Sequence, residues 1–296
     1  IPNSVTSIGN SAFYYCTGLT SIIIPDGVTS IGDNAFYGCS GLTSIIIPDS
    51  VTNIGYRTFS GCSGLTSVAI GNGVTNIGSN AFGSCRRLTE IYYNAAEVAD
   101  LTSNSNVFNR AGTSGGGIEV IFGDAVNSIP AYLFAVEHPD FRPKIINVTI
   151  GNNVTNIGDS AFDFCSWLTS IAIPDSVTSI GEEAFAYCSG LTSVIIGNDV
   201  ASIGSKAFYG CVGLTEIIYN AEEVVDLTFS DNVFYNAGIS GNGIKVTFGD
   251  SVGYIPAYLF YVNDSAYRPN ITSVTIGNNV TGIGNAAFYY CTGLTS

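Results

Sequence analysis

Eight cysteines are the most reactive side chains of this 296-residue chain, and they recur at one position of a repeated sequence. A thiol enzyme needs a histidine base beside its cysteine, but the sequence has a single histidine, His138. No CxxC or Cys/His spacing typical of zinc occurs either. An even count also fits disulfides, but a cysteine fixed at one inward position is more typical of a small buried hydrophobe. Free structural thiols are therefore predicted, with disulfides as the alternative, at Cys16, Cys39, Cys62, Cys85, Cys165, Cys188, Cys211 and Cys291.

One serine lies in a sequence that resembles a hydrolase motif. Gly112–Gly116 reads G-T-S-G-G and matches G-x-S-x-G, but that nucleophile elbow requires a strand-to-helix turn and a histidine base. Here the motif lies in a Ser/Gly/Asn-rich loop, and the related segment Gly238–Asn242 lacks it. Ser230-Asp231-Asn232 is too short for a calcium loop. The sequence predicts no enzyme, with no catalytic residue, no metal site and no cofactor.

The charge balance restricts the partners. The net charge is −14 with nine basic residues, and Arg86-Arg87 is the only adjacent basic pair. Such a chain is a poor ligand for nucleic acid or for an anionic membrane surface. No apolar run reaches the roughly 20 residues of a membrane helix. We expect no nucleic-acid partner, no membrane insertion in this sequence and no cluster of basic residues.

A repeated phrase positions all these residues. Residues Leu19–Gly41 read LTSIIIPDGVTSIGDNAFYGCSG, and the phrase returns 23 residues later at Leu42. A fixed period of this length is typical of a solenoid. Alternation predicts a strand around residues 20–24 with Ile23 facing outward. Asp33 is predicted to cap a short helix over residues 34–39.

The motif I-P-x-x-V-T-x-I-G-x-x-A-F-x-x-C resembles the BspA-like, or Treponema pallidum-type, leucine-rich repeats of bacterial surface antigens. The resemblance implies an α/β solenoid, a right-handed superhelix of stacked turns of about 23 residues. Each turn would contribute one parallel strand and one short helix. The resemblance also implies a cell-surface or extracellular location. In the first full copy the motif residues are Ile24, Pro25, Val28, Thr29, Ile31, Gly32, Ala35, Phe36 and Cys39.

The repeats predict one continuous solenoid over residues 1–296, because no segment resembles a linker. An irregular pair of turns recurs 126 residues apart, which indicates duplication of a larger block. The sequence begins and ends within a repeat, so we expect it to be a fragment whose signal and anchor lie outside it. The regular repeats occupy 1–87, 145–213 and 271–296, and the irregular duplicated turns occupy 88–144 and 214–270.

Outward strand positions are the candidate binding surface. An exposed apolar strip can mark a protein contact, although outward β-branched residues also simply favour strands. The irregular turns, with loops 100–117 and 226–243, are a second candidate because loops often carry recognition. The candidate residues are Ile23, Ile46, Ala69, Glu90, Tyr92, Asn94, Ile195, Glu216, Ile218 and Asn220.

The leading hypothesis is an adhesin-like module that binds a protein partner through its solenoid face. The resemblance supplies a host or matrix protein as that partner. A passive spacer and a carbohydrate-binding module are the alternatives. Exposed aromatic residues such as Tyr92, Tyr93 and Tyr219 could stack on sugars, although Tyr93 and Tyr219 have the strand parity of inward-facing residues.

Overall fold

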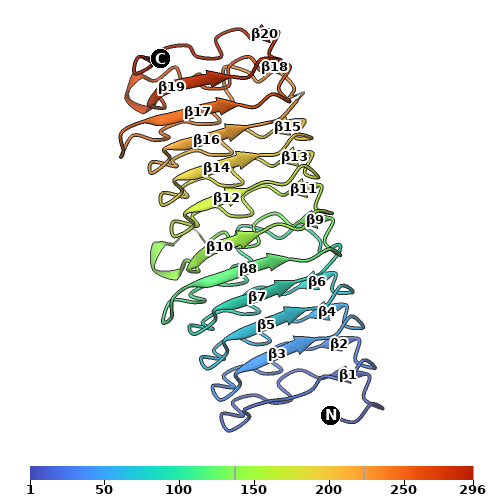
Figure 1. Cartoon of the computed structure of the whole chain (residues 1–296). Helices are drawn as coiled ribbons and strands as arrows, with labels where there is room; N and C mark the ends of the chain where they lie inside the picture. The colour runs from blue at the N-terminus through green and yellow to red at the C-terminus, as the bar shows by residue number, and fades with distance from the viewer. Residues whose placement is uncertain (137, 223, 296) are drawn as a thin grey trace. The chain divides into compact units, whose positions relative to one another are not determined.

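Alternation of inward and outward side chains creates the long strand of each repeat. In β3 (Ser44–Ile47), Ile45 and Ile47 are buried, whereas Ser44 and Ile46 are exposed. The computed structural model describes residues 1–136, 138–222 and 224–295 and comprises two units, Ile1–Gly151 and Asn152–Ser296. The main sheet of the first unit is parallel, in the order β3, β5 (Ser67–Ile70), β7 (Glu90–Tyr93), β8 (Ile118–Phe122) and β10 (Ile145–Thr149) (Figure 1).

A second ladder of two-residue strands follows the turn after each long strand. Each of these strands places an isoleucine in the core beside a polar residue. Such short pairings suffice because the neighbouring repeat supplies the same bonds at the same register. In the first unit they are β1 (Ser7–Ile8), β2 (Ser30–Ile31), β4 (Asn53–Ile54) and β6 (Asn76–Ile77), and β9 (Ser128–Ile129) comes later in the chain.

The second unit repeats this design except in its last short strand, where Gly282 replaces the polar residue and Ile283 is exposed. Its long parallel strands are β12 (Ser170–Ala172), β14 (Ser193–Ile196), β16 (Glu216–Tyr219), β17 (Ile244–Phe248) and β19 (Ile271–Ile276). Its short strands are β11 (Asn156–Ile157), β13 (Ser179–Ile180), β15 (Ser202–Ile203), β18 (Tyr254–Ile255) and β20 (Gly282–Ile283). The predicted solenoid-like repeat fold is confirmed. A single continuous solenoid over 1–296 stays a prediction.

Phenylalanines stack into a column in the core of each unit. Phe36 is fully buried, and its ring centroid lies 5.1 Å from that of Phe59 with the rings 3° from parallel. This distance is close to the spacing of neighbouring strands, so one ring per repeat fills the column. The column continues through Phe82, Phe108 and Phe134 in the first unit and runs through Phe162, Phe185, Phe208, Phe234 and Phe260 in the second.

The helix predicted over residues 34–39 is wrong. Asn34 and Gly38 adopt left-handed φ values of 55° and 70°, which an α-helix does not contain. The N–H groups of Asn34, Phe36 and Gly38 donate to carbonyls of the next repeat, and the N–H groups between them close turns within the repeat. In an α-helix, each N–H beyond the first turn instead donates to the carbonyl four residues earlier in the same segment. Inter-repeat bonds therefore replace helical bonds.

Asp33 also has a different role from the predicted helix cap. Its Oδ1 accepts a hydrogen bond from the N–H of Tyr56 in the next repeat at 2.8 Å. The described residues contain no α-helix and two 3₁₀ helices, η1 (Pro139–Phe141) and η2 (Ser265–Tyr267). Within the described part of the chain, no helix is long and apolar enough to cross a membrane.

The cysteines form a column beside the phenylalanines. The Sγ of Cys62 donates to the carbonyl of Phe36 in the preceding repeat at 3.2 Å, and Cys85 makes the same contact with Phe59. The cysteines are free thiols, and six are buried as predicted. Cys16, in the first repeat of the sequence, is exposed, and Cys291, in the last repeat, is half-buried.

Candidate functional site

Five outward residues form a row across the sheet of the first unit. The strand register aligns them in the order Ile46, Ala69, Tyr92, Ile121 and Thr149. Ile46 is 71% exposed and Tyr92 is 40% exposed. The row therefore presents apolar surface to solvent, as the alternation predicts. We call these five residues the sheet row.

Ile23 extends the apolar character of this face. It occupies the repeat position of Ile46 and is 80% exposed, although its segment carries no strand. Large side chains exposed to this degree in successive repeats contribute nothing to the core. Together with the sheet row, Ile23 makes an apolar strip of the kind that marks a contact surface.

A pair of carboxylates lies next to the sheet row. The register places Glu90 of β7 directly opposite Glu119 of β8, and like charges in this position repel. The Glu90 carboxylate accepts a hydrogen bond from the Tyr92 hydroxyl, which raises the pKa of Tyr92, and the charge of Glu119 adds to this effect. Ser67 Oγ lies 3.5 Å from Glu90 Oε2. The site therefore combines apolar area with negative charge that no basic neighbour offsets within the described row.

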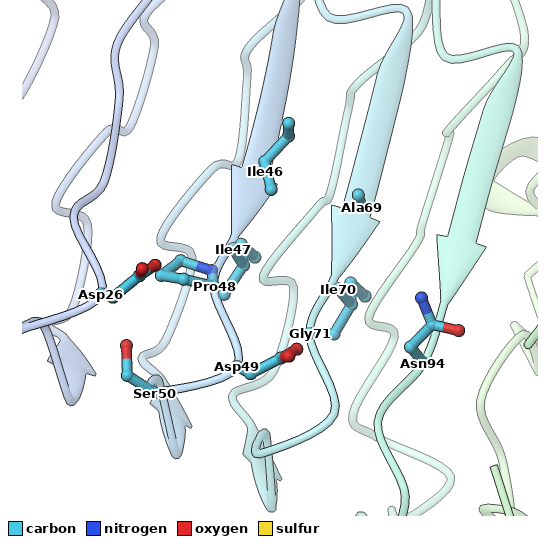
Figure 2. Close-up of a pocket in the computed structure, with 10 residues that line it drawn as sticks. All are labelled: Asp26, Ile46, Ile47, Pro48, Asp49, Ser50, Ala69, Ile70, Gly71 and Asn94. Carbon is cyan, nitrogen blue, oxygen red and sulfur yellow. The ribbon is translucent and has the colours of Figure 1, made fainter. Parts of the chain in front are cut away.

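A shallow hollow opens where β3, β5 and β7 end. Its volume is about 440 Å³. Figure 2 shows the carboxylates of Asp26 and Asp49 and the amide of Asn94 around it. Asp49 also joins two repeats, because its Oδ1 accepts from the N–H of Asn72 at 2.8 Å. The remaining lining residues are Ile46, Ile47, Pro48, Ser50, Ala69, Ile70 and Gly71.

The second unit carries a weaker version of the same surface. Ile195 is only 36% exposed, and Glu216 lies opposite Lys245 instead of a second glutamate. Ser193 Oγ lies 3.2 Å from Glu216 Oε2. The equivalent row is Ala172, Ile195, Ile218, Thr247 and Thr275. It differs from the first in having less exposed apolar area and an oppositely charged neighbour.

The structure separates the predicted candidates into two groups. In the first unit Ile46, Ala69, Glu90, Tyr92 and Asn94 lie on adjoining strands or at their ends. In the second unit Ile195, Glu216 and Ile218 adjoin, and half-buried Asn220 accepts a hydrogen bond from Ser251 Oγ through its main-chain carbonyl.

Sequence reasoning missed Glu119, which completes the carboxylate pair. Its position follows from aligning the irregular turn with the regular repeat, because Glu119 precedes Val120 as Glu90 precedes Ile91. Among the described residues, no three His, Cys, Asp or Glu side chains are arranged to hold a metal ion. Tyr93 and Tyr219 are fully buried, as their strand parity predicts.

The repeats of this chain match a known repeat family. The BspA type leucine rich repeat region matches in six copies, over residues 1–112, 127–267 and 263–296. The chain belongs to this family. In these BspA-type repeats the motif residues Val28, Ile31 and Phe36 are fully buried. The family motif therefore specifies the core, and the sheet row lies at positions that the motif leaves free.

Several solved structures of leucine-rich repeat proteins are similar to this chain. A leucine-rich repeat protein from Bacteroides ovatus shares 28% identity with a TM-score of 0.53, and the match covers all of this chain and 64% of that one. A leucine rich cell surface protein from Faecalibacterium prausnitzii shares 22% identity with a TM-score of 0.34, covering 93% and 86%. The T. pallidum leucine rich repeat protein shares 25% identity with a TM-score of 0.36, covering 66% and 75%. The sequence matches no curated protein.

Proposed function

We propose that this chain is a noncatalytic, adhesin-like module that binds a protein partner through the sheet face of its first unit. The observation that carries the proposal is the exposed apolar strip, in which Ile23 and Ile46 are 80% and 71% exposed. Single exposed apolar side chains are common on soluble proteins, but an exposed apolar patch formed by neighbouring repeats is typical of a contact surface. The BspA-type repeats supply a rigid sheet on which that surface is built.

The charges around the strip define the partner's chemistry. Glu90 and Glu119 lie along one side of the sheet row, and Asp26 and Asp49 lie around the hollow at the strand ends. A partner surface with an apolar centre and flanking lysine or arginine would complement both features. The match to a family of bacterial surface antigens supports a cell-surface or extracellular location and a host or matrix protein as partner.

A passive spacer is the second candidate, and the threonine columns favour it. The hydroxyl group of Thr43 donates to the main-chain carbonyl of Thr20. In the same way, the Thr66 hydroxyl donates to the carbonyl of Thr43, and the Thr89 hydroxyl donates to the carbonyl of Thr66. These exposed hydroxyl groups already donate hydrogen bonds that stabilise the stack of repeats. This part of the surface therefore has a structural role that requires no partner. A carbohydrate-binding role has less support, because the burial of Tyr93 and Tyr219 leaves Tyr92 alone of the three proposed aromatic contacts exposed.

The test is a binding screen of the chain against extracellular-matrix proteins and a glycan array. Any protein that binds is then titrated against Ile46→Asp and against Ile195→Asp, its matched control at the same repeat position in the second unit. We expect Ile46→Asp to weaken binding at least about tenfold and Ile195→Asp to leave it unchanged. Equal affinity for both variants would exclude the first sheet face. If no protein of the panel binds, the spacer hypothesis is favoured.

A further inference from the structure

Basic residues from two separate segments contact one loop of the first unit, contrary to the expectation from sequence. The loop at residues 112–117 contacts two segments that are distant from each other in the sequence. Ser114 N–H donates to the carbonyl of Arg86 at 2.8 Å, and Lys144 Nζ donates to the carbonyl of Gly115 at 3.4 Å. The fold thus brings Lys144 to the same loop as Arg86 and Arg87, although these residues are far apart in the sequence.

A hollow of about 380 Å³ lies on this side of the unit, where the long strands begin. Ser40, Ser63 and Arg86 share one repeat position, and Ser114 lies next to Arg86 through the bond just described. Arg87 and Gly64 complete the lining. The hollow is therefore lined by two arginines, which carry guanidinium groups, and by three serines, which carry hydroxyl groups. It is separate from the sheet row and from the hollow at the strand ends.

These groups are hydrogen-bond donors suited to an oxyanion. A guanidinium stays charged at every physiological pH and can hold a carboxylate, sulfate or phosphate through two parallel hydrogen bonds. Serine hydroxyls add further donors. Among the described residues the one salt bridge joins Lys206 and Glu183, so neither Arg86 nor Arg87 pairs with a described carboxylate.

The second unit shows which of these residues belong to the scaffold. At the positions equivalent to Arg86, Arg87 and Lys144, 126 residues later, the chain has Val212, Gly213 and Asn270. The three serines are retained there as Ser166, Ser189 and Ser240. The repeat therefore keeps the serines without the arginines, and the arginines are an addition specific to the first unit.

We propose that this hollow binds a single compact oxyanion group, a sulfate, phosphate or carboxylate carried by a small molecule. The net charge of −14 opposes a long polyanion, whereas one charged group needs only local donors. The proposal is independent of protein binding by the sheet row.

The test is calorimetric titration of the whole chain at low ionic strength with sodium sulfate, sodium phosphate, sodium glucuronate and a glucose sulfate ester, with glucose as the neutral control. The variants are Arg86→Val and Arg87→Gly, which introduce the residues of the second unit. Arg57→Ala is the matched control that removes a positive charge elsewhere. We expect at least one anion to bind, and each hollow variant to weaken it roughly tenfold or more.

We also expect added sodium chloride to weaken this binding, because salt screens exposed charges. Comparison of inorganic sulfate with the sulfate ester shows whether the sugar contributes. No heat with any anion would overturn the proposal, as would equal binding by wild type, Arg86→Val and Arg87→Gly. Loss of binding in Arg57→Ala to the same extent would also overturn it, because a general charge effect would then explain the result.

Discussion

The ring of Tyr187 lies against the backbone of Gly210 in the next repeat. A Cβ atom at Gly210 would lie 2.9 Å from Tyr187 Cδ1, and Gly210 has a φ of +69°. Tyr187 cannot easily move away, because its ring is stacked on Phe164 with centroids 4.6 Å apart. Gly61 occupies the same repeat position in the first unit with a φ of +75°, but its Cβ would meet nothing closer than 3.6 Å.

This pair of glycines separates backbone strain from crowding. We expect Gly61→Ala to cost about 1 kcal/mol of unfolding free energy through its left-handed φ alone. Gly210→Ala should cost about 1–3 kcal/mol more, because the Tyr187 ring must shift as well. Urea unfolding of both variants measures the difference. Equal costs would show that the ring yields freely.

Phe36→Ala should destabilise the first unit by about 3–5 kcal/mol, because it opens a cavity between two stacked rings. Phe36 is fully buried, with Phe13 at 5.0 Å and Phe59 at 5.1 Å between ring centroids. The control is Tyr14→Ala, whose side chain is 49% exposed and whose loss should cost below about 1 kcal/mol. A cost for Phe36→Ala as small as that of the control would contradict the column.

Thiol labelling should distinguish the eight cysteines by their place in the stack. A thiol reagent should modify exposed Cys16 promptly in the native chain, and half-buried Cys291 slowly because burial raises its pKa to about 11. The six buried thiols should react only after denaturation. Mass spectrometry counts the adducts, and Cys16→Ser should remove the prompt one. Fewer than eight adducts in denaturant without reductant would indicate disulfides.

The chain should lose stability at alkaline pH. Burial raises the pKa of Cys62 to about 12 and the pKa of Cys85 well above its usual value. Between about pH 9 and 12 the unfolded chain releases these thiol protons and the folded chain keeps them, so unfolding free energy falls by roughly 1.4 kcal/mol per pH unit for each thiol. Measuring the unfolding free energy at several pH values gives its slope against pH. The Cys62→Ala variant should have a shallower slope, by the contribution of one released proton. An unchanged slope would contradict the burial of that thiol.

The inter-repeat bond of Asp33 should be replaceable by an amide. Asp33→Ala removes the acceptor for Tyr56 N–H and should cost about 1 kcal/mol. Asp33→Asn should cost almost nothing, because Asn10 fills the position in the preceding repeat and its Oδ1 accepts from Asp33 N–H at 2.8 Å. Thermal unfolding compares the two. Equal destabilisation by Asn and Ala would mean that the charge itself matters.

The sequence predicts the strands and the core because both depend on local alternation. Ile23 and Ile46 face outward, and Phe36 and the repeated cysteines lie in columns, as the 23-residue period requires. The helix expected after Asp33 does not form, although Ala35 and Cys39 have helical spacing. The N–H groups of Asn34, Phe36 and Gly38 donate instead to the next repeat, which a single copy of the phrase does not contain. Asn34 and Gly38 were the available signal, since both residue types tolerate left-handed φ values.

The binding surfaces were less predictable, because they arise between segments distant in the chain. Glu90 meets Glu119 only through the register of the irregular turn. Arg86 and Lys144 meet only through the folded loop between them. The 23-residue period alone does not encode these contacts, because each involves a residue of an irregular turn that must first be aligned with the regular repeat.

The bonds between repeats have a consequence for how such chains change length. The Thr43-to-Thr20 and Thr66-to-Thr43 hydrogen bonds span the same 23 residues, and Cys62 and Cys85 each donate to a carbonyl 26 residues earlier. Recombination that removes or inserts one whole repeat, such as residues 42–64, recreates every one of these bonds at the new junction. Loss of a single residue instead turns the next strand over and sends its isoleucines into solvent. Recombination in genes for this architecture can therefore lengthen or shorten the stack of repeats by one repeat at a time while the core stays intact.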